Sequence, residues 1–324
     1  MNKFAKVMCM IAVVALTFTA CKKKEETANS FMFHGDTEQF IVENGDGSDF
    51  EKVSIDENNR LQFEAGDEIA IFNMKSVVTE SYWKIFTVQT DGSWTTTGGS
   101  MGNTDGCFYA FYPAQSVQST TFLDNDTRVT FNLQNTQEYA VDGNGRVRIP
   151  NNSLYAAAKD ETHTQINDAY FSFKNICGIL SLKFYSPSGK TVTSIEVTDA
   201  MFNLVGDVTL KIDEVEPTTM TTLFRSYSDD PTYQSQLAAY LGVLGYSTNN
   251  TDNKITLSCG NGVQLGTTKA EATQFYIVMR PLALLNGCTI KVNFSNGTSK
   301  TITSTKNNMI SPNVIKNIAA VSVG

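Results

Sequence analysis

Residues 169–185 read AYFSFKNICGILSLKFY, and their side-chain pattern decides the fold class that we expect. Within this stretch, Leu180, Leu182 and Phe184 alternate with polar or charged neighbours. A period of two places the apolar side chains on one face of a β-strand and the polar ones on the other. The stretch therefore predicts a strand that is buried on one face, as in an antiparallel sheet that packs on a core.

The same alternation recurs along the chain in short segments. Examples are Val129–Leu133, Val208–Ile212, Ile255–Cys259, Phe275–Met279 and Ile290–Phe294. Turn residues separate such segments; Asp91-Gly92-Ser93, for instance, lies between the strand-like residues 82–90 and 94–97 and predicts a hairpin. Short alternating strands divided by turns predict an all-β protein made of antiparallel β-sandwiches.

Length and local composition predict two domains. The chain has 324 residues, and a typical domain takes about 150. The polar stretch 160–168 precedes the run quoted above, so we expect an N-terminal domain at 31–168 and a C-terminal domain at 169–324. Helical spacing of apolar residues in Pro231–Tyr246 predicts one short helix inserted into the second domain.

The first residues are typical of an export signal. Lys3 and Lys6 precede an apolar run, so we expect residues 1–20 to be a signal peptide that is removed. The sequence LTFTAC at 16–21 resembles a bacterial lipobox, which predicts lipidation of Cys21 and a polar tether over residues 21–30. The alternative is an ordinary cleaved signal in which Cys21 is incidental.

Charge and cysteine content restrict the binding partners and the disulfide bonds that we expect. The net charge is −8 and the sequence has no basic stripe, which argues against a nucleic-acid partner. Besides Cys9 and Cys21, the chain has Cys107, Cys177, Cys259 and Cys288. Cys177 and Cys259 lie at apolar strand positions, where a buried free thiol is expected. One disulfide among the four is the alternative, and three pairings are open.

We find no motif for catalysis, a metal or a cofactor. His34 and His163 lie far apart in polar surroundings, outside any nucleophile motif. The acidic stretches 124–126 and 142–145 share features with a calcium loop but lack its full ligand set, so we interpret them as turns. No glycine-rich loop opens a helix, which argues against nucleotide binding. We expect no enzymatic activity, no cofactor and no metal site.

Aromatic residues allow a second interpretation. Trp83 and Trp94, with Tyr82, Tyr109 and Tyr112, are candidates for a platform on which sugar rings stack. Packing within the core and across strands is the alternative. On the first interpretation the protein is a glycan-binding surface lipoprotein.

Several landmarks, taken in order, resemble the fimbrillin family of Bacteroidales, the lipoprotein-derived pilins of the Fim and Mfa type. They are Phe31–Phe33, Phe63–Phe72, Tyr109–Ala114, Phe171–Leu180, Phe202–Asp207, Phe275–Pro281 and Ile310–Val323. The resemblance implies two transthyretin-like β-sandwich domains in tandem. It also implies a subunit of a fimbrium, anchored by lipid in the outer membrane at the cell surface, with other fimbrial subunits and host or bacterial surface ligands as partners.

The resemblance further implies processing near the N-terminus. In this family a trypsin-like protease cuts after a basic residue, and removal of the first strand opens a groove that a neighbouring subunit's strand fills. Lys52 and Arg60 are the only Lys or Arg residues between Lys24 and Lys75, so they are the candidate processing sites. An exposed residue that is never cut is the alternative for each.

Overall fold

The computed structural model describes fourteen stretches of the chain, and all its elements lie within them. These are residues 32–37, 41–44, 63–74, 82–97, 107–123, 126–141, 145–149, 154–160, 168–200, 203–211, 247–248, 253–284, 287–304 and 308–324. They form strands β1 to β25 and two 3₁₀ turns, η1 (Ala114–Ser116) and η4 (Lys269–Glu271). The predicted all-β class is therefore confirmed; the helix expected at 231–246 lies outside the described residues. Within them, no helix has the length and apolar character needed to cross a membrane.

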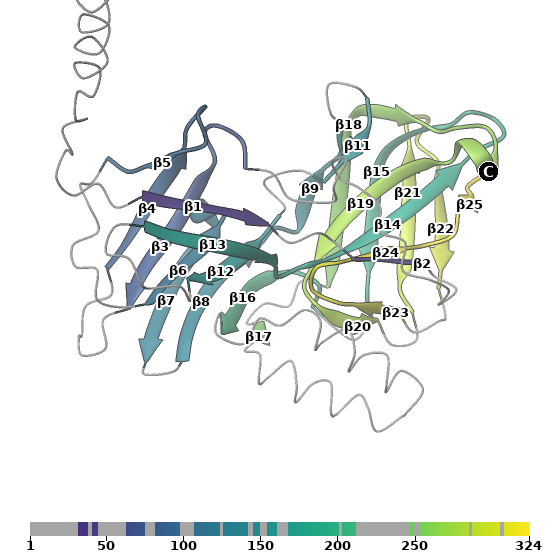
Figure 1. The fold of residues 1–324 in the computed structure, drawn as a ribbon. Helices are drawn as coiled ribbons and strands as arrows, with labels where there is room; N and C mark the ends of the chain where they lie inside the picture. The colour runs from purple at the N-terminus through teal and green to yellow at the C-terminus, as the bar shows by residue number, and fades with distance from the viewer. Residues whose placement is uncertain are drawn as a thin grey trace, which may run out of the picture.

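The N-terminal body is built around a seven-stranded sheet. Its order is β1-β13-β12-β6-β3-β4-β5. The bounds are β1 (Met32–Thr37), β13 (Asp168–Asn175), β12 (Ala156–Asp160), β6 (Cys107–Tyr112), β3 (Glu68–Met74), β4 (Tyr82–Val88) and β5 (Trp94–Thr95). Adjacent strands are antiparallel except β1 and β13, which run parallel. In Figure 1, β1 and β13 lie across the direction of β3, β4 and β6.

A second sheet packs against one face of β3 and β6. It contains β17 (Ser247–Thr248), β16 (Gly206–Lys211), β8 (Asp126–Leu133) and β7 (Val117–Leu123). Phe111 of β6 contacts Phe131 of β8 with ring centroids 5.1 Å apart. Because layers cover both faces, every residue of Ile69–Phe72 and Phe108–Tyr112 is buried. Strands buried on both faces lose the polar alternation and appear as continuous apolar runs.

The C-terminal body is a sandwich of two further sheets. One has the order β19-β14-β24-β2, with β25 also paired to β14; the other has the order β22-β21-β15-β18-β9. The bounds are β2 (Ile41–Asn44), β9 (Thr136–Glu138), β14 (Gly178–Tyr185), β15 (Thr191–Thr198), β18 (Lys254–Gln264), β19 (Thr273–Met279), β21 (Thr289–Phe294), β22 (Ser299–Thr303), β24 (Val314–Asn317) and β25 (Val321–Ser322). Two small ladders, β10 (Ala140–Val141) with β11 (Val147–Arg148) and β20 (Leu282–Leu284) with β23 (Asn308–Ile310), complete the set.

Some strands pair with sheets on the far side of the predicted boundary at residues 168 and 169. β16 pairs with β8, β9 pairs with β18, and β2 pairs with β24. The buried Gln137 of β9 also bridges to the other sheet of the C-terminal body. Its Nε2 donates to the carbonyl of Val278 at 2.6 Å, and its Oε1 accepts from the Val278 amide at 2.9 Å. The predicted boundary remains a prediction, and the two bodies share strands around it.

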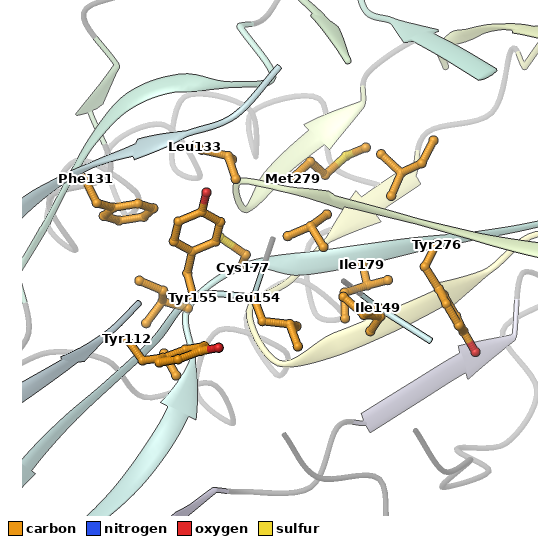
Figure 2. Packing of buried hydrophobic residues seen from close by; sticks show 14 of the residues in the cluster. Tyr112, Phe131, Leu133, Ile149, Leu154, Tyr155, Cys177, Ile179, Tyr276 and Met279 are labelled. Carbon is orange, nitrogen blue, oxygen red and sulfur yellow. The ribbon is translucent and has the colours of Figure 1, made fainter. Parts of the chain in front are cut away.

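The apolar core is continuous through both bodies. Figure 2 shows side chains from this cluster, including Phe131, Tyr155 and Cys177. The hydroxyl of Tyr155 donates to the carbonyl of Asn132 at 3.1 Å, which satisfies its polar end inside the core. A core shared in this way ties the two bodies together.

The described cysteines are buried free thiols. They are Cys177, Cys259 and Cys288, so the prediction for Cys177 and Cys259 is confirmed. Burial raises the pKa of Cys177, raises that of Cys259 to about 12 and raises that of Cys288 to about 11. Cys107 lies in β6, but its side chain is outside the described residues.

Candidate functional site

β1 is the outermost strand of its sheet and the first described strand of the chain. It pairs with β13 over its whole length, from Met32 opposite Asp168 to Thr37 opposite Phe173. Within the part of the chain that the structure describes, β1 has no strand on its other edge. The pairing joins residues more than 130 positions apart in the sequence.

Phe33 anchors β1 in the aromatic core. Its side chain is 2% exposed. The ring meets Phe86 at 4.7 Å and Phe108 at 5.4 Å, both edge to face, and lies nearly parallel to Phe171 at 6.0 Å. Each such pair adds about 0.5–1.5 kcal/mol beyond the burial of its area. Phe33 therefore connects β1 with β4, β6 and β13 at once.

Gly35 brings the backbone of β1 unusually close to β13. A Cβ atom at this position would lie 2.2 Å from the carbonyl oxygen of Phe171, its partner in the ladder. No side chain fits at that distance, and the obstructing atom belongs to a backbone that cannot rotate away. Thr37, two positions further along β1, is 3% exposed. The inward face of β1 thus presents a large ring, no side chain and a small side chain in turn.

A second group of rings extends the cluster behind β1. Trp94 stacks on Phe171 at 6.2 Å with an interplanar angle of 3°. Phe63 contacts Trp94, Tyr112 and Phe173 at 5.8, 5.2 and 5.0 Å. These contacts fill the space between β5, β6 and β13 with aromatic side chains.

Three of the five aromatic residues that were candidates for a sugar-stacking platform are buried and cannot contribute to one. Trp94 is 7% exposed, and Tyr109 and Tyr112 are buried as well. They belong to the core because β3 and β6 are covered on both faces. Trp83 is 46% exposed and stacks on Phe72 at 6.1 Å. The side chain of Tyr82 lies outside the described residues. Core packing is the correct interpretation of Trp94, Tyr109 and Tyr112.

Two of the sequence landmarks meet beside this cluster. Asp67 Oδ1 accepts a hydrogen bond from the hydroxyl of Tyr112 at 3.2 Å, and its Oδ2 accepts one from the amide of Glu64 at 2.7 Å. Gly66, with φ of 98°, allows the tight turn that directs Asp67 inward. Burial raises the pKa of Asp67 despite these hydrogen bonds. Burial, followed by the nearby Asp67 charge, raises the pKa of Tyr112.

The next strand of the chain joins a different sheet. β2 runs parallel to β24, from Ile41 opposite Val314 to Asn44 opposite Asn317. β24 in turn pairs with β14 on its other side. Three residues separate the end of β1 from the start of β2. β1 and β2 therefore add one strand to each body, as Figure 1 shows.

Several residues singled out in the sequence lie outside the described residues. They are Cys21, Lys52, Arg60, His163, Asp124, Asn125 and 142–144. His34 lies in β1 opposite Tyr170, but its side chain is not among those described. Where the structure describes side chains, it contains no group of three or more His, Cys, Asp or Glu arranged to hold a metal.

The sequence interpretation missed Gly35 and the placement of β2. A lone glycine in a short strand is a recognised signal of close backbone approach, so Gly35 had a visible cue. Residues 41–44 carry no such cue.

Comparisons with known proteins find likeness in structure alone. No family model and no curated protein sequence matches the chain. A proposed cell adhesion protein from Bacteroides ovatus is 11% identical with a TM-score of 0.46, covering 87% of this chain and 88% of its own. One from Bacteroides uniformis is 12% identical with a TM-score of 0.46, covering 90% and 93%. A fimbrial protein from Bacteroides ovatus is 13% identical with a TM-score of 0.43, and the match covers 91% of this chain and 50% of that one.

Proposed function

We propose that the protein is a structural or adhesive subunit of a cell-surface fimbrium. In this proposal it is exported as an outer-membrane lipoprotein anchored through Cys21, and it assembles with other fimbrial subunits by strand addition. Its bodies are two transthyretin-like sandwiches in tandem, at 31–168 and 169–324. Its external ligands are on host or bacterial surfaces. The proposal includes no enzymatic activity, cofactor or nucleic-acid partner.

The placement of β1 and β2 is the observation that best supports this proposal. Both strands precede Lys52 and Arg60 in the sequence. A cut after either residue leaves β1 and β2 attached to the rest of the protein only by non-covalent contacts. Their departure would uncover the edge of β13, the edge of β24 and the rings around Phe33.

The physics of a bare strand edge favours strand addition. A bare strand edge offers unpaired amides and carbonyls, and an incoming extended peptide satisfies them while its alternate side chains fill the pockets beneath. An exposed edge also promotes aggregation, so an intramolecular strand that covers it until assembly is protective. In the proposal, β1 has this covering role.

The mature N-terminus in the assembled state tests the proposal. We would shear surface fibres from cells and determine the N-terminus and intact mass of this subunit. We expect chains that begin at Val53 or Leu61 and fibres that are lost when both Lys52→Ala and Arg60→Ala are present. Lys75→Ala is the matched control. Chains that begin only at Cys21, with no fibre and no other subunit co-purifying, would contradict the proposal.

A further inference from the structure

We propose that the edge of β13 selects its partner strand by a three-position pattern. The pattern is a large aromatic residue, a glycine two positions later and a small residue two positions after that, as in Phe33, Gly35 and Thr37. The partner is an extended strand of a second polypeptide that lies parallel to β13. This inference rests on the proposed function, because it names the chemistry of the strand that replaces β1.

The aromatic position is defined by the space that Phe33 fills. Three rings from three different strands converge on it, at centroid distances of 4.7, 5.4 and 6.0 Å. Phe86, Phe108 and Phe171 are themselves buried, so a smaller side chain would leave a cavity lined by aromatic carbon. Burying a phenylalanine-sized group there accounts for much of the attraction between strand and edge.

The glycine position excludes any strand that carries a side chain there. The 2.2 Å separation between a Cβ at position 35 and the carbonyl oxygen of Phe171 forbids every residue with a side chain in this register. A strand that carried alanine here would have to withdraw from β13 and lengthen its ladder hydrogen bonds. A shift of the register by one residue does not relieve the clash without cost, because it turns the aromatic residue to the outer face.

The third position favours a small side chain, and the intervening positions allow variation. Thr37 is buried opposite Phe173. Asp36, by contrast, is exposed. Because only alternate residues of a strand face the core, selectivity at this edge is confined to the inward positions. The edge therefore discriminates among incoming strands by shape at positions 33, 35 and 37.

The test uses the full chain with a specific protease site placed between residues 45 and 60. After cleavage, we would measure by fluorescence anisotropy the binding of labelled FMFHGDT, the sequence of residues 31–37, and of its variants. We expect Phe33→Ala and Gly35→Ala peptides to bind more than tenfold more weakly than the parent. We expect the Asp36→Ala peptide to bind within about twofold of it. A Gly35→Ala peptide that binds as well as the parent would overturn the inference, as would a vacated edge that fails to bind the parent.

A second arm covers the case in which the cleaved segment stays bound and blocks the peptides. Native mass spectrometry would follow how fast that segment leaves in cleaved proteins carrying Gly35→Ala or Asp36→Ala. Faster loss with Gly35→Ala alone supports the inference, and equal rates contradict it. If selectivity holds here while the protein sheared from cells begins only at Cys21, with no fibre and no other subunit co-purifying, the proposed function fails and the selectivity of the edge stands.

Discussion

Phe33 attaches β1 to the core through ring contacts with Phe86, Phe108 and Phe171. We expect Phe33→Ala to lower the free energy of unfolding by about 3 kcal/mol, since truncation of a buried ring removes its burial and leaves a cavity. Denaturant titration followed by circular dichroism measures this change. The matched control is Asp36→Ala on the exposed face of the same strand, for which we expect less than about 0.5 kcal/mol. A loss at Phe33 no larger than the control would contradict the anchoring role.

Asp67 gives a prediction about pH. Its ordinary pKa is 3.8, and burial raises it in the folded protein. The folded state therefore favours the protonated acid, so the contribution of Asp67 to stability is greatest below pH 3.8 and is lost as the pH rises through the folded pKa. We expect the stability of the wild type relative to Asp67→Asn to fall as the pH rises from about 3 into the neutral range. Urea unfolding of both proteins across this range is the measurement, and a relative stability that rises with pH would refute the assignment.

The buried thiols predict slow chemical labelling. Because the thiolate is the reactive form, a raised pKa and burial both protect a cysteine. We expect Cys177, Cys259 and Cys288 to resist iodoacetamide at pH 8 in the folded protein and to react readily in denaturant. Peptide mapping by mass spectrometry resolves each site. Rapid modification of Cys177 in the folded state would be inconsistent with its position in the core.

At the scale of the strand, the sequence predicts which side chains of one strand are buried better than it predicts which strands and layers pack against that strand. Leu182 and Phe184 are buried and Lys183 is partly exposed, as the alternation predicts, but Ser181 on the predicted polar face is fully buried. Periodicity cannot reveal that Ile69–Phe72 is covered on both faces, because this depends on which layers pack there. The parallel pairing of β1 with β13 depends on the same tertiary contacts. The sequence left the burial of Trp94 open for the same reason, because Trp94 stacks on Phe171 of a distant strand.

A single side chain completes one edge of the C-terminal sandwich. Gln137 supplies both hydrogen bonds that a neighbouring strand would give to Val278. We expect Gln137→Leu to lower the free energy of unfolding by about 2 kcal/mol, because it leaves a buried amide and carbonyl unpaired. Hydrogen exchange at the Val278 amide should accelerate as well. Glu138→Leu, on the exposed side of the same strand, is the control, and an equal effect of both changes would contradict this role.

The described residues form two bodies that share strands and a core, and strands β1 and β2 each add to one of them. The all-β class could be predicted from alternating apolar residues and turn residues. The order of the strands could not be predicted in this way, because β16, β9 and β2 each pair across the boundary that composition predicts. Pairings between such distant residues leave little trace in the local pattern of a single sequence. The candidate site was foreseen only as a short strand around Phe33.

The central claim is that β1 occupies a place which another subunit's strand takes during assembly. A disulfide between β1 and β13 tests it most directly. Asp36 and Ser172 are exposed partners in the ladder, and the spacing of paired strands suits a disulfide. With Asp36→Cys and Ser172→Cys together, we expect a folded subunit that forms no fibres when oxidised and forms them again on reduction. Each single substitution should assemble normally, and oxidised double-substituted protein that polymerises as well as the wild type would contradict the claim.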